Sequence, residues 1–306
     1  MFTHPSTVWF RAALVVSAAC WGIATVISKT ALHYLPPVTL LVTQLAVSVA
    51  FLWTLLLIQR KPISWNKRWL TVSLLGWLNP GLAYTLSLLG LAHTTASMST
   101  LLWAIEPILI LGLAWLILRE RLTPRLIALS LLAVAGVLFV AGLGFDVGAA
   151  SSGRGNGLIL AGVACCAVYT VLARRVGADM DALMLVALQQ TCALIWALVI
   201  WPIELWLVGI EPLRAIPVSA WGWALVSGVI YYALAFWFYL VGLKRLPASQ
   251  AGLFLNLIPV FGVSAAFLWL GERLSPPQLF GAALILVAMV GLFSPASIRS
   301  KPVTHF

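Results

Sequence analysis

The stretch LLWAIEPILI, residues 101–110, places one carboxylate and one proline inside an apolar run that extends from Ser97 to Leu118. This run is long enough to cross a bilayer as a helix. A charged side chain at the bilayer centre costs roughly 2.5–3.5 kcal/mol on insertion scales, so such residues usually face a cavity or a partner. Pro107 removes a backbone donor next to Glu106, which loosens the helix there. The pair therefore indicates a functional position within a membrane-spanning helix.

The composition indicates a polytopic membrane protein. Of the 306 residues, 62% are hydrophobic and 8% are charged, whereas soluble domains carry about 25% charged residues. The net charge of +10 could also indicate nucleic-acid binding. However, the Lys and Arg residues lie mostly at the ends of apolar runs and form no basic stripe interleaved with aromatics. We therefore predict a lipid bilayer around the chain and no nucleic-acid partner.

Ten apolar runs of about 20 residues predict an all-α membrane protein with ten transmembrane helices. The runs lie over residues 10–30, 38–58, 70–91, 97–118, 125–143, 156–175, 182–202, 220–242, 249–270 and 277–293. If the N-terminus is cytoplasmic, only Lys29, Arg154, Arg214 and Arg273 of the 18 basic residues fall on the outer side. The positive-inside rule then predicts that both termini lie in the cytoplasm.

The second half of the chain repeats the first. At a shift of 152 residues, Gly90 aligns with Gly242 and Pro107 aligns with Pro259. Each copy holds five predicted spans, and an odd number makes the second copy enter the membrane from the opposite side. Two inverted five-helix repeats around a site near the midplane are typical of secondary transporters.

The repeat sets the predicted domain boundaries. The first repeat is predicted over residues 10–143 and the second over 156–294, joined by a linker over 144–155 and followed by a cytoplasmic tail over 295–306. The glycine-rich stretch 153–157 lacks the Gly-Lys-Ser/Thr ending of a phosphate-binding loop, so we interpret it as linker. The first span also resembles the sixth at a shift of 145 residues, and at the same shift Gln44 of the second span aligns with Gln189 of the seventh.

Two related sets of motifs support a resemblance to a known family. They are Trp21-Gly22, Glu106-Pro107 and Leu118-Arg119-Glu120-Arg121-Leu122-Thr123-Pro124 in the first half, and Asn256-Leu257-Ile258-Pro259 and Leu270-Gly271-Glu272-Arg273-Leu274-Ser275-Pro276 in the second. With the five-plus-five arrangement, the chain resembles the EamA-type members of the drug/metabolite transporter superfamily over about residues 10–294. The resemblance implies a multi-pass carrier of the bacterial inner membrane that moves small metabolites, often outward, through a central cavity. Many relatives carry a basic residue where this chain has Gln44, which weakens any expectation of an anionic substrate.

Glu106 is the carboxylate predicted near the centre of a span, and its repeat mate is Ile258. Two functional roles are open: a counter-ion for a substrate amine, or a protonation site that couples export to proton entry. The alternative is a hydrogen-bonded Glu that only braces the break at Pro107. The residues predicted to contact substrate are Glu106, Asn256, Trp21, Thr25, Tyr84, Trp103, Tyr169 and Gln189. Aromatic members could wall a cavity for an aromatic or cationic substrate, although packing is the alternative for each, and the amides could simply join helices.

Two further pairs of motifs concern the framework. Pro107 and Pro259 share one repeat position, where a weakened helix could bend during gating, although a packing kink is nearly as consistent. Glu120-Arg121 and Glu272-Arg273 are predicted to close helices as structural locks of the following hairpin, since a basic group suits a helix C-terminus.

The residues exclude most other functions. Gly262-Val263-Ser264-Ala265 superficially resembles an intramembrane serine-protease site, but no histidine follows in a later span to act as base. The four cysteines lie in apolar runs without metal-ligand spacing. We therefore predict a carrier, not an enzyme, with no cofactor or metal. A passive facilitator or an uptake permease is the alternative to an exporter.

Overall fold

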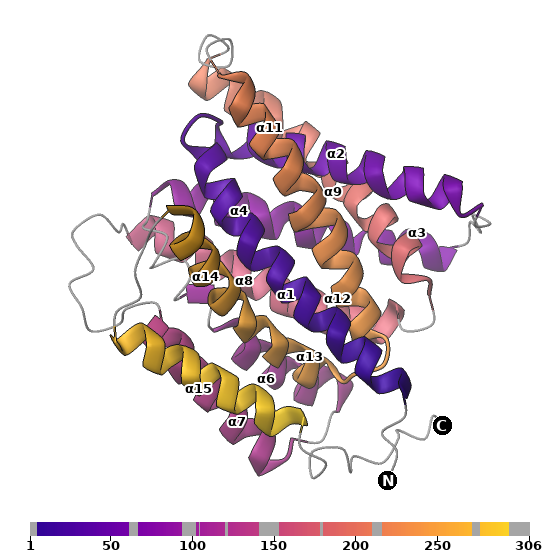
Figure 1. Ribbon diagram of the computed structural model, residues 1–306. Coiled ribbons are helices and arrows are strands. Elements are labelled where there is room, and N and C mark those ends of the chain that lie inside the picture. The colour runs from indigo at the N-terminus through magenta and orange to yellow at the C-terminus, as the bar shows by residue number, and fades with distance from the viewer. Residues whose placement is uncertain are drawn as a thin grey trace.

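The computed structural model describes residues 5–60, 67–93, 102–103, 105–119, 122–140, 153–177, 180–209, 216–270 and 276–293. In these ranges the chain forms helices and no strands (Figure 1). The elements are α1 (Pro5–Leu32), α2 (Pro37–Ile58), α3 (Lys67–Ser73), η1 (Trp77–Leu82), α4 (Ala83–Ala92), α6 (Glu106–Leu118), α7 (Pro124–Val140), α8 (Gly153–Gly177), α9 (Ala182–Val208), α11 (Val218–Ser227), η2 (Gly228–Leu234), α12 (Ala235–Leu243), α13 (Ala248–Phe254), η3 (Leu255–Leu257), α14 (Ile258–Leu270) and α15 (Pro276–Phe293). Segments η1 and η2 are π-helical, and η3 is a 3₁₀ turn.

Six helical stretches in the described part of the chain are long and apolar enough to cross a bilayer. They are Val8–Leu32, Pro37–Ile58, Trp69–Ala92, Gly153–Arg175, Ala182–Val208 and Val218–Leu243. Four shorter apolar helices accompany them, over Glu106–Leu118, Pro124–Gly136, Ala248–Gly262 and Leu279–Ala288. The chain is thus an all-helical, multi-pass membrane protein.

Two of the boundaries that differ from the prediction change its interpretation. Helix α9 does not end at Pro202 but continues to Val208, because a proline removes only one backbone donor and further apolar residues follow it. The stretch 153–157 is not a linker, since it forms the start of α8. Its small residues let α8 approach α4 closely: a Cβ atom added to Gly155 would lie 2.9 Å from the carbonyl oxygen of Gly90.

Helical interruptions occur at matching places in the two halves. Asn79, inside η1, has extended backbone angles (φ −147°, ψ 121°), so the chain between α3 and α4 is not one regular helix. Shifted by 152 residues, Trp77–Leu82 falls within η2 of the second half. Helix α6 begins at Glu106 with Pro107 in its first turn. Helix α14 begins at Ile258, directly after η3, with Pro259 in its first turn. A proline is well accommodated there, because the first backbone N–H groups of a helix have no intrahelical partner.

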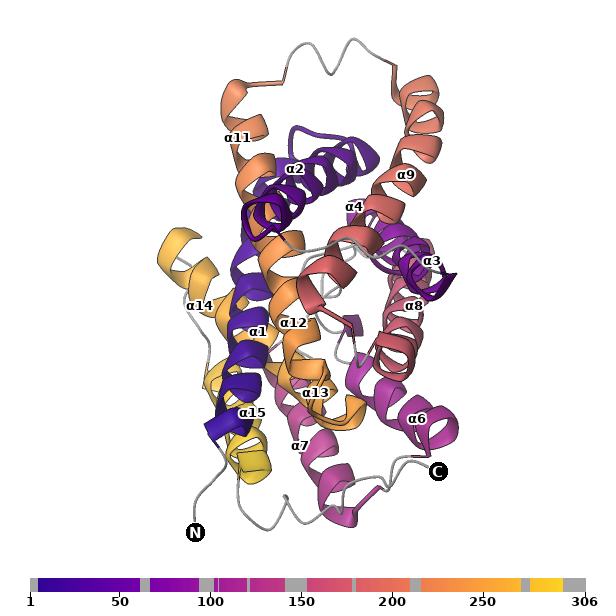
Figure 2. The same cartoon turned by 90° about the vertical axis from the view of Figure 1, so that its right-hand side faces the viewer.

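The helices of the two halves pack in matching pairs. Helix α1 packs against α12 and α14, while α8, its counterpart in the second half, packs against α4 and α6. The remaining pairs are α2 with α9 and α7 with α15. Helices α1 and α12 lie side by side in both views of the molecule, as do α7 and α15 (Figures 1 and 2). The most extensive helix packing therefore joins elements from different halves.

Two glycines, Gly76 and Gly228, lie at close approaches that the repeat relates. A Cβ atom added to Gly76 would overlap the backbone of Gln189 in α9. One added to Gly228 would lie 2.7 Å from the carbonyl oxygen of Gln44 in α2. Gly76 and Gly228 are 152 residues apart, and Gln44 and Gln189 are 145 apart, so one contact is the repeat image of the other.

Candidate functional site

Glu106 is buried, with 6% of its surface exposed, in the first turn of α6. A carboxylate is favoured at this end of a helix, because the unpaired N–H groups carry partial positive charge. Within the part of the chain that the structure describes, the Glu106 carboxyl group has no hydrogen-bonding or ion-pair partner. The side chains within its electrostatic range are Tyr84, Cys166, Tyr231 and Tyr239.

Aromatic side chains from both halves surround this position. We call them the central aromatic cluster, which consists of Trp21, Tyr84, Trp103, Tyr169, Tyr231, Tyr232, Phe236 and Tyr239. Tyr84 is its hub, with ring centroids 5.4 Å from those of both Tyr231 and Tyr232. Trp21 packs edge-on against Phe236 at 5.2 Å. These are contact distances, so in this conformation the rings pack on one another, and a ligand enters only when they separate.

Polar atoms of the cluster are partly paired. The Tyr231 hydroxyl is hydrogen bonded to the side chains of Thr25 and Tyr84. The Tyr239 hydroxyl donates to Thr170 Oγ1 at 3.3 Å. The indole N–H of Trp21 is buried and finds no acceptor among the described residues. An unsatisfied buried donor costs about 1–3 kcal/mol, so this group is available to an acceptor on a bound molecule.

The structure brings most of the predicted contact residues together. Trp21, Tyr84, Trp103 and Tyr169 belong to the cluster, and Thr25 reaches it through Tyr231. These residues thus lie close together, as predicted. That they contact a substrate is a proposal.

The two predicted amides make bonds within the protein. Gln189 Oε1 accepts from the Tyr169 hydroxyl at 2.8 Å, and its Nε2 donates to the Val72 carbonyl at 3.2 Å. Gln189 thereby joins α9 to α3 and α8. Asn256, 2% exposed, donates from Nδ2 to the Leu253 carbonyl of its own segment, beside the 3₁₀ turn. Both arrangements serve the framework of the site.

Several predicted framework residues cannot be placed. Glu120, Arg121, Glu272 and Arg273 lie outside the described residues, and for Pro259 only the backbone is described.

The sequence analysis did not single out two members of the cluster, Tyr231 and Phe236, or the neighbouring Cys166. The repeat contains a signal for two of them. At a shift of 145 residues Cys166 aligns with Trp21, and at a shift of 152 residues Phe236 aligns with Tyr84. Tyr84 and Phe236 are also in ring contact, at 6.0 Å, so repeat mates meet at the junction of the two halves.

A second buried carboxylate was also missed. Glu204, 8% exposed in α9, accepts from the backbone N–H groups of Val38 and Thr39 at 2.7 Å each and from Thr39 Oγ1 at 2.8 Å. It thus caps the N-terminus of α2 from another helix. Trp201 Nε1 donates to Thr39 Oγ1 at 2.9 Å and closes the arrangement. Both oxygens of this carboxylate are paired, whereas the Glu106 carboxyl group has no partner among the described residues, so we interpret Glu204 as structural.

We expect Glu204→Gln to lower the free energy of unfolding by about 2 kcal/mol, because hydrogen bonds to a charged acceptor contribute about 1.5–3 kcal/mol. Thermal unfolding of the purified protein would measure the loss. Thr39→Val should be destabilising too, and the double variant less so than the sum of the two, since both changes break one network. Additive effects would contradict the cap.

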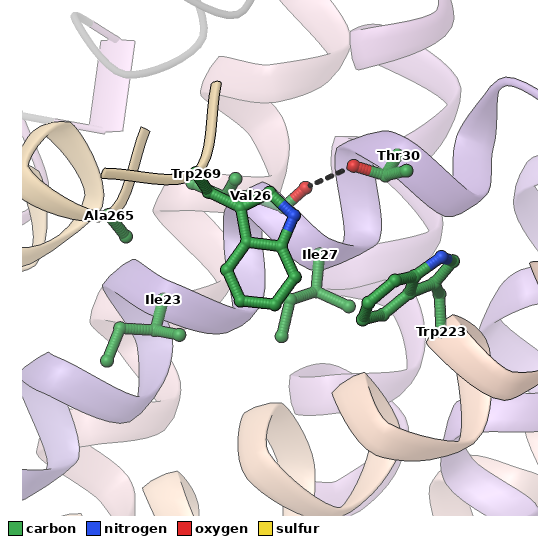
Figure 3. Close-up of a pocket in the computed structure, with 7 residues that line it drawn as sticks. All are labelled: Ile23, Val26, Ile27, Thr30, Trp223, Ala265 and Trp269. Carbon is green, nitrogen blue, oxygen red and sulfur yellow. Dashed lines mark hydrogen bonds between the residues drawn. The ribbon is translucent and has the colours of Figure 1, made fainter. Parts of the chain in front are cut away.

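A separate small pocket lies between α1, α11 and α14 (Figure 3). It is lined by Ile23, Val26, Ile27, Thr30, Trp223, Ala265 and Trp269. The only hydroxyl group in this lining, on Thr30, donates to the Val26 carbonyl at 3.1 Å, as Figure 3 shows. Because the lining holds no titratable side chain, this pocket lacks the polar groups that would orient a charged molecule. The central aromatic cluster with Glu106 is the better candidate site.

The sequence model of the EamA-like transporter family matches residues 9–142 and 153–294. The chain belongs to this family. The two matched ranges fall in the two halves of this EamA protein, and together they cover most of its length.

Proteins similar to this EamA protein carry transporter or exporter names. "Uncharacterized transporter YetK" of Bacillus subtilis is 27% identical over 70% of this chain and 64% of its own length. "Probable terminal-alkyne amino-acid exporter" of Streptantibioticus cattleyicolor is 30% identical over 64% and 63%, respectively. "Threonine/homoserine exporter RhtA" of Escherichia coli is 28% identical over 56% and 54%. The aligned regions span less than two thirds of each of these relatives.

A solved crystal structure shares the fold of this EamA protein. It superimposes with a TM-score of 0.73, covering 94% of this chain and 97% of the other, at 17% sequence identity. The likeness extends over both halves.

Proposed function

We propose that this EamA protein is a secondary transporter that moves a small metabolite, amino acid-like or drug-like, out across the bacterial inner membrane. The observation that carries the proposal is the buried Glu106 carboxyl group, which has no partner among the described residues and lies beside an aromatic cluster built from both halves. An intramembrane ionisable group of this kind marks a functional site by default. The exporter names of two relatives favour outward movement of a small molecule.

The proposed architecture has ten spans in two inverted five-helix repeats over 10–143 and 156–294, with both termini in the cytoplasm. The matching helix pairs support it, since α1 meets α12 and α14 as α8 meets α4 and α6. The glycine contacts, Gly76 with Gln189 and Gly228 with Gln44, support the same two-fold relation. In such folds substrate sites lie at the repeat interface.

The proposed mechanism is alternating access by rocking of one repeat against the other. The π-helical segments η1 and η2 and the breaks before Pro107 and Pro259 are places where the helices can bend. Trp21, Thr25, Tyr84, Trp103 and Tyr169 would wall the site, with Gln189 and Asn256 holding its framework. Separation of the aromatic rings would then admit substrate to Glu106, which pairs with a substrate amine, a proton, or each in turn.

A passive facilitator or an uptake permease is the alternative, and flux in proteoliposomes distinguishes these classes. For a carrier we expect uptake of labelled substrate that saturates and is stimulated by unlabelled substrate on the opposite side. Candidate substrates come from a metabolite and toxicity screen of cells that overproduce the protein. Linear, unsaturable flux would contradict a carrier, and flux driven only inward would contradict an exporter.

A further inference from the structure

Among the described residues, one acid, Glu106, and no base act on the central aromatic cluster. Glu106 acts electrostatically on Tyr84, Tyr231, Tyr239 and Cys166, and in the described ranges no Lys, Arg or His acts on these groups. The segment that precedes Glu106 adds none, because residues 94–105, TTASMSTLLWAI, contain no ionisable side chain. The site is therefore negative when Glu106 is ionised and neutral when it is protonated. None of the described groups gives it a state with a positive charge.

The arrangement of the aromatic rings also favours a positively charged ligand. Aromatic faces carry negative charge density and attract cations, most strongly where water is excluded. The Tyr84 and Tyr231 rings stand at 89° to each other, and those of Trp21 and Phe236 at 81°. Rings at near right angles present faces in several directions around one centre. Once the rings separate, a cationic group beside Glu106 would meet both the carboxylate and aromatic faces.

A carboxylate on the ligand would find no such partners. It would lose its hydration on entering the cluster and would lie near Glu106, a group of like charge. The indole N–H of Trp21 is a single neutral donor, which suits a carbonyl, ether or hydroxyl oxygen better than an anion. The site thus distinguishes an amine from the corresponding amino acid.

We infer that Glu106 and the central aromatic cluster bind a monovalent organic cation: an amine with an aromatic or bulky apolar body and no free carboxylate. This inference rests on the proposed function and narrows its substrate class, because it selects drug-like amines and excludes zwitterionic amino acids. The exporter names of the relatives do not lead to it.

Binding to the purified full-length protein tests the inference with three probes of one shape. Phenethylamine is a cation, phenylalanine a zwitterion and 3-phenylpropanoate an anion at neutral pH. We expect titration calorimetry to show at least tenfold tighter binding of phenethylamine than of phenylalanine, and the weakest binding for 3-phenylpropanoate. A second series of tryptamine, tryptophan and indole-3-propanoate should give the same order with a larger ring.

Two variants assign the selectivity to its source. Glu106→Gln should weaken binding of the amines at least tenfold and abolish their advantage over the zwitterions. Glu204→Gln changes the other described buried acid, which caps α2, and should keep the order of affinities even where it lowers stability. Phenylalanine bound as tightly as phenethylamine, an unchanged order in Glu106→Gln, or no binding of any of the six probes would each overturn the inference.

Counter-flow in proteoliposomes separates this inference from the proposed function. Saturable, counter-flow-stimulated transport of phenylalanine that exceeds transport of phenethylamine would overturn the cation site but leave the carrier in place. If amine binding depends on Glu106 but neither the probes nor any screened metabolite shows saturable flux, the cation site would stand and the carrier would be overturned.

Discussion

Glu106→Gln is expected to reduce carrier-mediated flux at a fixed, subsaturating substrate concentration by at least 100-fold, with little change in folding. Gln has nearly the shape of Glu, so packing beside Pro107 and the aromatic rings is retained, but the charge is lost. Breaking a buried charge pair by removing one member costs about 3–5 kcal/mol, and 1.4 kcal/mol corresponds to a factor of ten in an equilibrium constant. This cost applies to Glu106 paired with a substrate amine, because Glu106 is buried and has no other partner among the described residues.

The measurement is counter-flow in proteoliposomes with and without an imposed pH gradient. If Glu106 also carries the coupling proton, the wild-type flux responds to the gradient and that of Glu106→Gln does not. Glu106→Asp, which keeps the charge on a shorter side chain, should retain part of the flux and the response to pH. Equal flux and equal pH response in wild type and Glu106→Gln would show that the residue only braces the helix break.

The membrane class and the helical fold could be predicted because they depend on composition and hydropathy along the chain, and the family because its motifs recur in both halves. The site could be predicted only in part. Trp21 and Tyr84 stood out as aromatic residues deep in apolar runs, whereas Phe236 was passed over as an ordinary apolar side chain. Its role follows from its contact with Tyr84, its repeat mate. Contacts between halves depend on how the repeats pack, which hydropathy does not specify.

Glu204 is a buried charge whose pairing could not be predicted from the sequence. A hydropathy criterion ends the seventh span before this acid, since a charge is costly in a bilayer. In the folded chain its carboxylate is satisfied by N–H groups more than 160 residues away, at Val38 and Thr39. The helix therefore continues to Val208. Only a tertiary contact could reveal that the Glu204 carboxylate is paired, whereas that of Glu106 finds no partner in the described part of the chain.

Gly76→Ala and Gly228→Ala are expected to destabilise the protein strongly, although alanine normally stabilises a helix. Both glycines have helical backbone angles (φ −61°, ψ −28° and φ −58°, ψ −46°), so the backbone itself admits alanine. What forbids it is the approach of the neighbouring helix, because the added Cβ atom would overlap the backbone of Gln189 or lie 2.7 Å from the carbonyl oxygen of Gln44. Backbone cannot move aside as a flexible side chain can.

Two other glycines provide matched controls, since nothing lies within 4 Å of a Cβ atom added to Gly112 or Gly222. Gly112→Ala and Gly222→Ala should leave stability unchanged or raise it, by up to about 1 kcal/mol from helix propensity. Gly76→Ala and Gly228→Ala should instead lose about 3 kcal/mol, at the upper end for overpacking. Thermal unfolding midpoints of the four purified variants, each compared with the wild type, show whether each substitution lowers or raises stability. Similar midpoints for all four would contradict the close approach of α2 and α9 to the π-helical breaks, and with it the two-fold relation on which the proposed rocking depends.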